Sequence, residues 1–155
     1  MSSPDQSAHR VVAWDREMRE IHERLRSAIA VARESVHTRT ESVDLLTYCW
    51  GFCAALTGHH EGEDVALFPA VTAAHPELVP VVAKLVQDHD MNGALIQGLE
   101  SALRSGRAPE VIEGHLDGLE AIMESHFRYE ERELMGVLQG LELGGAVPTD
   151  VFGPL

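Results

Sequence analysis

The sequence predicts an all-α protein, an up-down-up-down four-helix bundle followed by an irregular C-terminal tail. Apolar residues make up 45% of the chain and aromatic residues only 5%, a balance that favours packed helices over a sheet. Apolar residues also recur at helical spacing in four long segments, which short polar or Pro- and Gly-containing stretches separate. Four long helices with short connections are typical of this kind of bundle.

Each helical segment is expected from its own apolar period. The first covers about 11–36 and the second about 43–73, with a bend near Pro69 because proline removes an intrahelical hydrogen bond. The third covers about 77–103 and the fourth about 109–139, on either side of a Gly- and Pro-containing turn. The positions expected to face inward are Trp14, Met18, Ile21, Leu25, Ala28, Ala32, Leu45, Phe52, Leu56, Leu67, Leu78, Val82, Leu85, Ile96, Leu99, Ile112, Leu116, Leu119, Ile122, Leu134 and Leu138.

Length, charge and cysteine content narrow the class of protein. The 155 residues fit one domain, which we expect at 9–139, with 140–155 as the tail. A net charge of −13 argues against nucleic acid or an anionic membrane as partner, since both need basic patches. No segment resembles a signal peptide and no apolar run is long enough to span a bilayer, so the expected location is the cytoplasm. Cys49 and Cys53 lie one helical turn apart and are expected as packed thiols, because that spacing suits a disulfide poorly.

An internal repeat with a period of 67 residues relates the two halves of the chain. It joins histidines to histidines and glutamates to glutamates, and around the second histidine pair the residue after each glutamate is also acidic, Asp64 in the first half and Glu131 in the second. The chain order is therefore His, His-x3-Glu, His, His-x3-Glu. The repeated pairs are His22 with His89, His59 with His126, and Glu63 with Glu130.

The spacing of the four repeated histidines also predicts their height in the bundle. The midpoints between consecutive histidines fall at residues 40–41, 74 and 107–108, inside the three connections. Residues equidistant from a turn lie at the same level in an antiparallel bundle, so one histidine from each helix is expected in a single layer. All four lie on the apolar stripes of their helices. Glu63 and Glu130 share a face with the histidine four residues before them.

Four imidazoles and two carboxylates in an apolar interior indicate a metal site, because burying them without a partner costs too much free energy. Imidazole with carboxylate and no thiolate suits iron or manganese, with zinc as an alternative. His60 has the right height but is rotated by about 100° from His59, and Glu131 competes with Glu130 as ligand. His60 is therefore expected to support a ligand or face an interface, with direct ligation as the alternative. The remaining histidines, expected at the surface or at helix ends, are His9, His37, His75 and His115.

The order His22, His59-x3-Glu63, His89, His126-x3-Glu130, followed after the first motif by Leu67-Phe68-Pro69, resembles the hemerythrin-like family with its HHE cation-binding domain, over about 10–140. The resemblance implies a four-helix bundle that holds two iron ions with an oxo or hydroxo bridge. It also implies that Glu63, with Glu130 or Glu131, bridges the ions while the four histidines cap them.

The chain departs from the oxygen-carrying members of that family, which have a second histidine where this sequence has Gly93. Water, His60 or Tyr129 could take that position. Their fourth-helix spacing would also select Glu131. The resemblance therefore favours binding or reduction of dioxygen, nitric oxide or hydrogen peroxide over reversible oxygen carriage, with turnover undecided and an electron donor unidentified. The alternative is an iron or redox sensor without turnover. A ferritin-type site is disfavoured because the one Glu-x2-His, at Glu34, lies off the layer, and a phosphotransfer bundle because no histidine has the expected setting.

Overall fold

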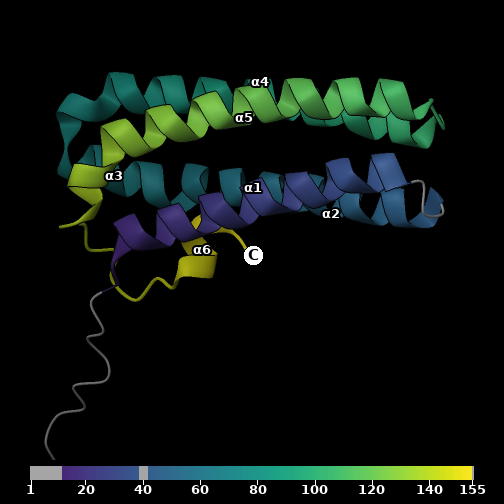
Figure 1. Ribbon diagram of the computed structural model, residues 1–155. Coiled ribbons are helices and arrows are strands. Elements are labelled where there is room, and N and C mark those ends of the chain that lie inside the picture. Colours follow the sequence, from purple (N-terminus) through teal and green to yellow (C-terminus); the bar gives the residue numbers. More distant parts are fainter. Residues whose placement is uncertain (1–11, 39–41, 155) are drawn as a thin grey trace, which may run out of the picture.

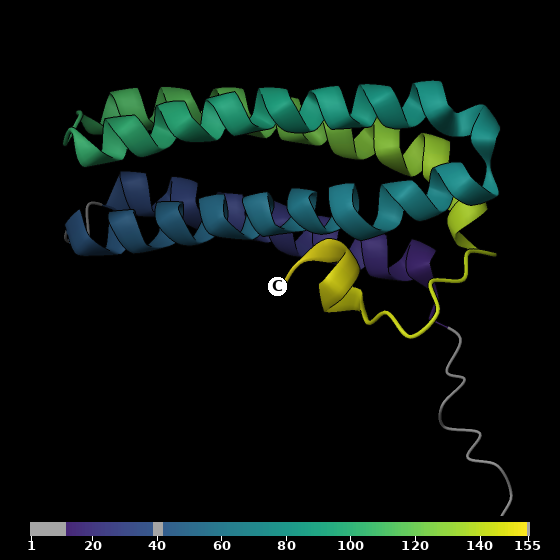
Figure 2. The same cartoon turned by 180° about the vertical axis from the view of Figure 1, so that it is seen from behind.

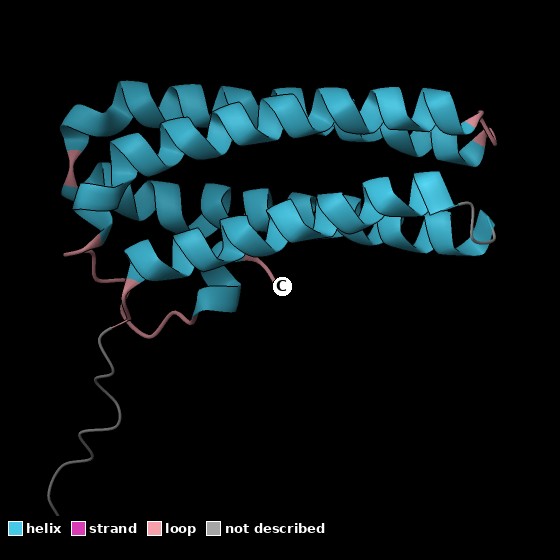
Figure 3. Cartoon of the chain, in the orientation of Figure 1, coloured by secondary structure: helices cyan, strands magenta, loops and turns pink. Residues whose placement is uncertain are grey.

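The computed structural model describes residues 12–38 and 42–154, and within these ranges the chain is helical and has no strand (Figure 3). This confirms the all-α class. In chain order the elements are α1 (Trp14–Thr38), α2 (Ser42–Gly62), the π-helical turn η2 (Glu63–Leu67), α3 (Phe68–Ala74), the 3₁₀ turn η3 (Pro76–Leu78), α4 (Val79–Arg104), α5 (Pro109–Leu138) and α6 (Pro148–Phe152).

The long helices lie side by side and surround a common core. α1 contacts α2 and α5, α5 contacts α4, and α4 contacts α2. Figures 1 and 2 show the same neighbours from opposite sides, with the connection from α3 to α4 at one end of the molecule and the connection from α4 to α5 at the other. Each long helix therefore has two long neighbours, and its apolar stripe is turned toward the middle.

The second predicted helix, 43–73, is interrupted one turn after His59. Five residues form a π turn between α2 and α3, in which the N–H of Phe68 donates to the carbonyl of Glu63, five residues earlier. Pro69 follows directly and has no N–H to donate, so the regular i to i−4 pattern cannot pass through it. Single π turns inside helices occur frequently at functional sites, and this one begins at Glu63.

Most of the positions expected in the core are buried. Four are only partly buried, Ala28, Leu78, Val82 and Ile122, and the side chain of Leu45 lies outside the described residues. The fully buried ones are Trp14, Met18, Ile21, Leu25, Ala32, Phe52, Leu56, Leu67, Leu85, Ile96, Leu99, Ile112, Leu116, Leu119, Leu134 and Leu138.

Cys49 and Cys53 are buried free thiols. Burial raises the pKa of Cys49 to about 11 and that of Cys53 to about 12, so both are unreactive neutral groups at ordinary pH. The expectation of packed thiols without a disulfide is confirmed. None of the described helices is at once long enough and apolar enough to cross a lipid bilayer.

The tail is not irregular throughout, as the sequence analysis expected, because Pro148–Phe152 form α6. Pro148 starts this helix, and the N–H of Val147 donates to Oδ2 of Asp150 at 3.2 Å. Val151 and Phe152 are buried, and α6 contacts α1, α2 and η2. Val151 and Phe152, an apolar pair in a Gly- and Pro-rich stretch, thus fold back onto the long helices. Two residues are too few to show a helical period in the sequence.

Two glycines permit the close approach of the tail to α2. A Cβ added at Gly62 would lie 2.6 Å from the carbonyl oxygen of Val151. Gly153 has φ of 85°, which favours glycine, and a Cβ there would lie 2.7 Å from the carbonyl carbon of Gly58. The backbone of the tail therefore packs directly on the backbone of α2, and the tail reaches the level of His59.

Candidate metal centre

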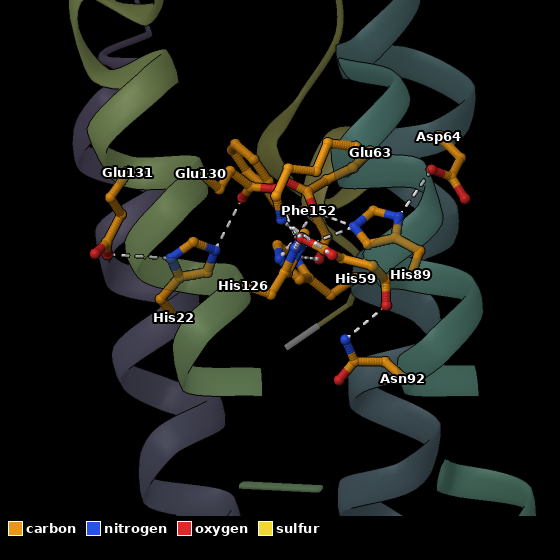
Figure 4. A network of polar contacts seen from close by, with 12 residues as sticks. His22, His59, Glu63, Asp64, His89, Asn92, His126, Glu130, Glu131 and Phe152 are labelled. Carbon is orange, nitrogen blue, oxygen red and sulfur yellow. Dashed lines mark hydrogen bonds and ion pairs between the residues drawn. The ribbon is translucent and has the colours of Figure 1, made fainter. Parts of the chain in front are cut away.

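The four repeated histidines meet in the interior, one from each long helix, with both repeated glutamates between them (Figure 4). All six side chains are at least 95% buried. This arrangement follows from the equal spacing of the histidines about the three connections. The six are His22 of α1, His59 of α2, Glu63 at the start of η2, His89 of α4, and His126 and Glu130 of α5.

Each glutamate contacts two histidines, one from the pair α1 and α2 and one from the pair α4 and α5. Oε1 of Glu63 lies 3.3 Å from Nε2 of His59 and 3.3 Å from Nε2 of His89. Glu130 contacts the other two histidines, with Oε1 3.1 Å from Nε2 of His22 and Oε2 3.4 Å from Nε2 of His126.

These contacts define two groups of four ligand atoms that share both glutamates, and within each group all atoms lie within 4.8 Å of one another. One group takes its imidazoles from α1 and α2, and the other takes them from α4 and α5. Two adjacent cations with both carboxylates between them fit this arrangement. The groups are His22, His59, Glu63 and Glu130, and His89, His126, Glu63 and Glu130.

The outer nitrogen of each histidine contacts an oxygen acceptor, which fixes the ring and its tautomer. A carboxylate or carbonyl oxygen can only accept, so Nδ1 of each ring carries a proton, and Nε2 is the atom that would supply its lone pair to a metal. The contacts from Nδ1 are His22 to Glu131 Oε1 at 3.1 Å, His59 to the Phe152 carbonyl at 3.1 Å, His89 to Asp64 Oδ1 at 2.8 Å, and His126 to Asp88 Oδ2 at 3.2 Å.

The two buried glutamates carry different charges in the metal-free protein. Burial, and then the neighbouring Glu130, raise the pKa of Glu63 well above its ordinary value. Burial also acts to raise the pKa of Glu130, but the polar contacts with His126 and His22 outweigh it and hold that pKa well below the ordinary value. Glu63 is thus a neutral acid and Glu130 a carboxylate until a cation arrives.

The histidines differ in the same way. Burial, followed by the nearby His22, lowers the pKa of His59 to about 3. Burial acts to lower the pKa of His126 too, but the hydrogen bonds to Glu130 and Asp88 overcome it and raise that pKa. A metal ion must therefore displace protons from Glu63 and His126 when it binds.

The donor atoms fit a metal pair because several of them are buried without a hydrogen-bond partner. These orphaned atoms include Nε2 of His59, both carboxyl oxygens of Glu63 and Oε2 of Glu130. Burying polar atoms unsatisfied is costly, and cations between the two glutamates would engage all of them. Imidazole with carboxylate is a donor set that suits iron, manganese and zinc.

Of the seven residues that the sequence marks as ligands, six lie in the two groups and Glu131 does not. Glu131 contacts the outer nitrogen of His22, and its side chain is 24% exposed. The sequence left Glu130 and Glu131 as competing ligands, and the regular helix α5 turns Glu130 inward and Glu131 toward α1. The hydrogen bond from His22 lowers the pKa of Glu131.

The remaining histidines and the candidates for the missing ligand position also have definite places. His75 is partly buried and contacts Glu77, and His115 is partly buried beside Gly98, so neither reaches the layer. His9 and the side chain of His37 lie outside the described residues.

Tyr129 lies between two cations, with Lys84 Nζ 4.3 Å and Arg132 Cζ 5.3 Å from its ring centre. A Cβ at Gly93 would meet no atom within 4 Å.

Sequence reasoning missed three of the four outer acceptors, namely the Phe152 carbonyl, Asp88 and Asp64. The repeat could have indicated Asp64, because it aligns Asp64 with Glu131. Asp64 contacts His89 in the second half of the chain, and Glu131 contacts His22 in the first half. Asp88 directly precedes His89, and an acid at that position follows no diagnostic pattern. A backbone carbonyl carries no residue signature at all.

The chain matches the family model of the hemerythrin HHE cation-binding domain over residues 15–138. No curated protein and no solved structure matches it significantly. The matched segment covers most of the chain and contains all six inward-facing histidines and glutamates. The chain is therefore a member of the hemerythrin HHE cation-binding domain family.

Proposed function

We propose that this protein is a four-helix bundle that holds two iron ions, bridged by Glu63 and Glu130 and by an oxo or hydroxo group, and that it binds or reduces a small oxidant. Dioxygen, nitric oxide and hydrogen peroxide are the candidate ligands. The observation that carries the proposal is the pair of ligand groups that share both glutamates.

The balance of charge in the layer supports a pair of cations. Two glutamates and neutral imidazoles bind cations, and their outer partners, Glu131, Asp64 and Asp88, add three carboxylates just outside the layer. Such partners orient metal-binding histidines and make them stronger donors. Among metals that accept imidazole and carboxylate, iron also supplies redox chemistry.

Aromatic rings enclose the ligands and limit access of water. Phe127 stacks on His22 with ring centres 3.8 Å apart, Phe68 lies 5.3 Å from His89, and Phe152 lies 5.8 Å from His59. Two ferrous ions together supply two electrons, the number that reduces peroxide to water or dioxygen to peroxide. The protons needed would pass through the outer carboxylates, of which Asp64 is 39% exposed.

The test is reconstitution of metal-free protein with ferrous iron without oxygen, followed by iron analysis and optical spectra. We expect two iron ions per chain, and near-ultraviolet absorption of an oxo-bridged ferric pair after addition of peroxide or dioxygen. A protein that takes up iron, but whose spectrum is unchanged by dioxygen, nitric oxide and peroxide alike, would contradict the proposal. His126→Ala should abolish uptake, while the matched change His115→Ala, outside the layer, should not.

The tail favours one alternative function, sensing of iron or redox state without turnover. The Phe152 carbonyl accepts from His59, so the tail contacts a ligand directly. Loss or oxidation of metal would then alter tail docking and expose a surface to a partner. Limited proteolysis within 140–147, with and without a chelator, tests this. A cleavage rate and association state that chelation leaves unchanged would rule it out.

An electron donor would be needed for repeated turnover, and a negatively charged surface would suit a donor with a basic docking face. We place the protein in the cytoplasm and expect neither nucleic acid nor membrane as partner, because the net charge is −13.

A further inference from the structure

The 67-residue repeat extends to a pair of rings that cover the ligand histidines. Phe127, the residue after His126, stacks on His22, with ring centres 3.8 Å apart and planes 8° apart. His60, the residue after His59, stacks on His89, with ring centres 3.9 Å apart and planes 11° apart. His60 and Phe127 therefore occupy equivalent places in the two halves.

The two equivalent rings differ in chemistry. Phe127 is fully buried and apolar, as a packing ring should be. His60 is 5% exposed, and its Nε2 is buried without any hydrogen-bond partner. A ring that only packs needs no nitrogen there, and an unsatisfied buried nitrogen destabilises the folded state. The repeat thus places a polar atom in one half where the other half has none.

The orphaned imidazole lies on one side of the metal centre. His60, His89 and His126 each offer a nitrogen, and the three nitrogens lie within 4.8 Å of one another. The rings of His60 and His126 meet edge to face, with centres 5.3 Å apart. Metal–nitrogen bonds are about 2.1 Å long, so two nitrogens on one ion lie at most about 4.2 Å apart. A small side-chain shift would therefore bring all three onto one ion.

We propose that His60 is the third imidazole ligand of the metal ion held by His89 and His126. The assignment rests on the proposed metal pair and makes its two positions unequal. The position between α4 and α5 receives three imidazoles, one of them from α2, while the position of His22 and His59 receives two. Tyr129, the other side chain considered for the missing ligand position, instead lies between the cationic groups of Lys84 and Arg132.

The variant His60→Phe tests the assignment, because it places in the first half the ring that the second half has at Phe127. Stacking on His89 is kept and only the nitrogens are lost. His75→Phe is the matched control, since His75 lies outside the layer. Anaerobic titration of metal-free protein with Co²⁺ should show two tight sites in wild type and control. In His60→Phe we expect one tight site, with the second weakened by at least about 100-fold.

X-ray absorption of the cobalt-loaded proteins gives a second readout, which does not depend on activity. We expect five imidazole ligands per metal pair in wild type and four in His60→Phe. Melting curves of the metal-free proteins check the fold, and the variant should melt no lower than wild type. Two tight sites in His60→Phe, or four imidazoles in wild type, would overturn the role of His60 and leave the metal pair intact. A wild-type protein without a metal pair would overturn both proposals.

Discussion

The carbonyl oxygen of Phe152 lies 3.1 Å from Nδ1 of His59, so a residue near the end of the chain orients a histidine of the candidate metal centre. The other three histidines of the layer contact carboxylates through Nδ1. A carbonyl cannot take up a proton, which makes this contact insensitive to pH but dependent on the docking of the tail. Docking of the tail in turn depends on Gly62 and Gly153, which let the backbone of the tail pack directly against the backbone of α2.

Gly62→Ala is therefore expected to displace the tail and weaken metal binding. The added Cβ would lie 2.6 Å from the Val151 carbonyl oxygen, which forces the tail or α2 to move. Loss of an outer partner of a ligand histidine lowers metal affinity by about 10- to 100-fold, and Co²⁺ titration measures it. Gly51→Ala, on the same helix, is the control, because a Cβ there meets nothing within 4 Å. It should raise stability by about 0.5–1 kcal/mol and leave affinity unchanged.

Asp64→Ala and Glu131→Ala should have similar effects, because the repeat gives the two acids equivalent contacts. Asp64 accepts from His89 and Glu131 from His22, and each loss should cost about 10- to 100-fold in affinity. Isothermal titration with Zn²⁺ measures this, and the exposed Asp90→Ala is the control. Should Glu131→Ala abolish binding as completely as Glu130→Ala does, Glu131 is a ligand and the contact with His22 is not its main role.

The histidine layer was predictable from the sequence for a geometric reason. Helix rise is constant, so equal spacing about each connection places His22, His59, His89 and His126 at one height, and the apolar stripes point them inward. The choice between Glu130 and Glu131 was not predictable, because neighbouring residues differ by about 100° in direction and only the packed helix decides which acid faces the core.

The tail contact and the stacking of His60 were beyond sequence reasoning for different reasons. Val151 and Phe152 are too few to show a period, and their docking depends on a glycine far away in the chain, Gly62. His60 was recognised at the right height, but its stacking on His89 depends on how α2 packs against α4. The 67-residue repeat would have indicated this stacking, because it aligns His60 with Phe127.

Changing each of the two buried glutamates to glutamine should have different effects on the stability of the metal-free protein. Glu63 has a raised pKa because of burial and the nearby Glu130, so it is already a neutral acid, and Glu63→Gln should change stability by less than about 0.5 kcal/mol. Glu130 is ionised between His126 and His22, so Glu130→Gln breaks buried charged contacts at about 3 kcal/mol or more.

Urea unfolding of both variants after exhaustive chelation measures this difference. Both should lose the second metal ion, since an amide cannot bridge two cations as a carboxylate does. Equal destabilisation by the two amides would show that the glutamates share their charge evenly. Loss of metal with no change in stability from Glu130→Gln would show that its contacts with the histidines contribute nothing until metal binds.

Stability of the metal-free protein should fall as the pH drops below about 6.5, partly because of His60. Burial, and then the nearby His89, hold the pKa of His60 well below the ordinary value, so the folded chain keeps this ring neutral where the unfolded chain binds a proton. The stabilisation is complete above the unfolded pKa and is lost toward acid, at about 1.4 kcal/mol per pH unit. His126 has a raised pKa and acts in the opposite sense.

Comparison with His60→Phe isolates the contribution of His60 from that of the other histidines. Urea unfolding at pH 7.5 and pH 5.5 should show a smaller loss of stability in His60→Phe than in wild type, while His75→Phe should follow wild type. An equal loss in all three proteins would mean that His60 takes up a proton in the folded state. The ring would then have a charged partner in the metal-free layer, and its buried Nε2 would not be orphaned.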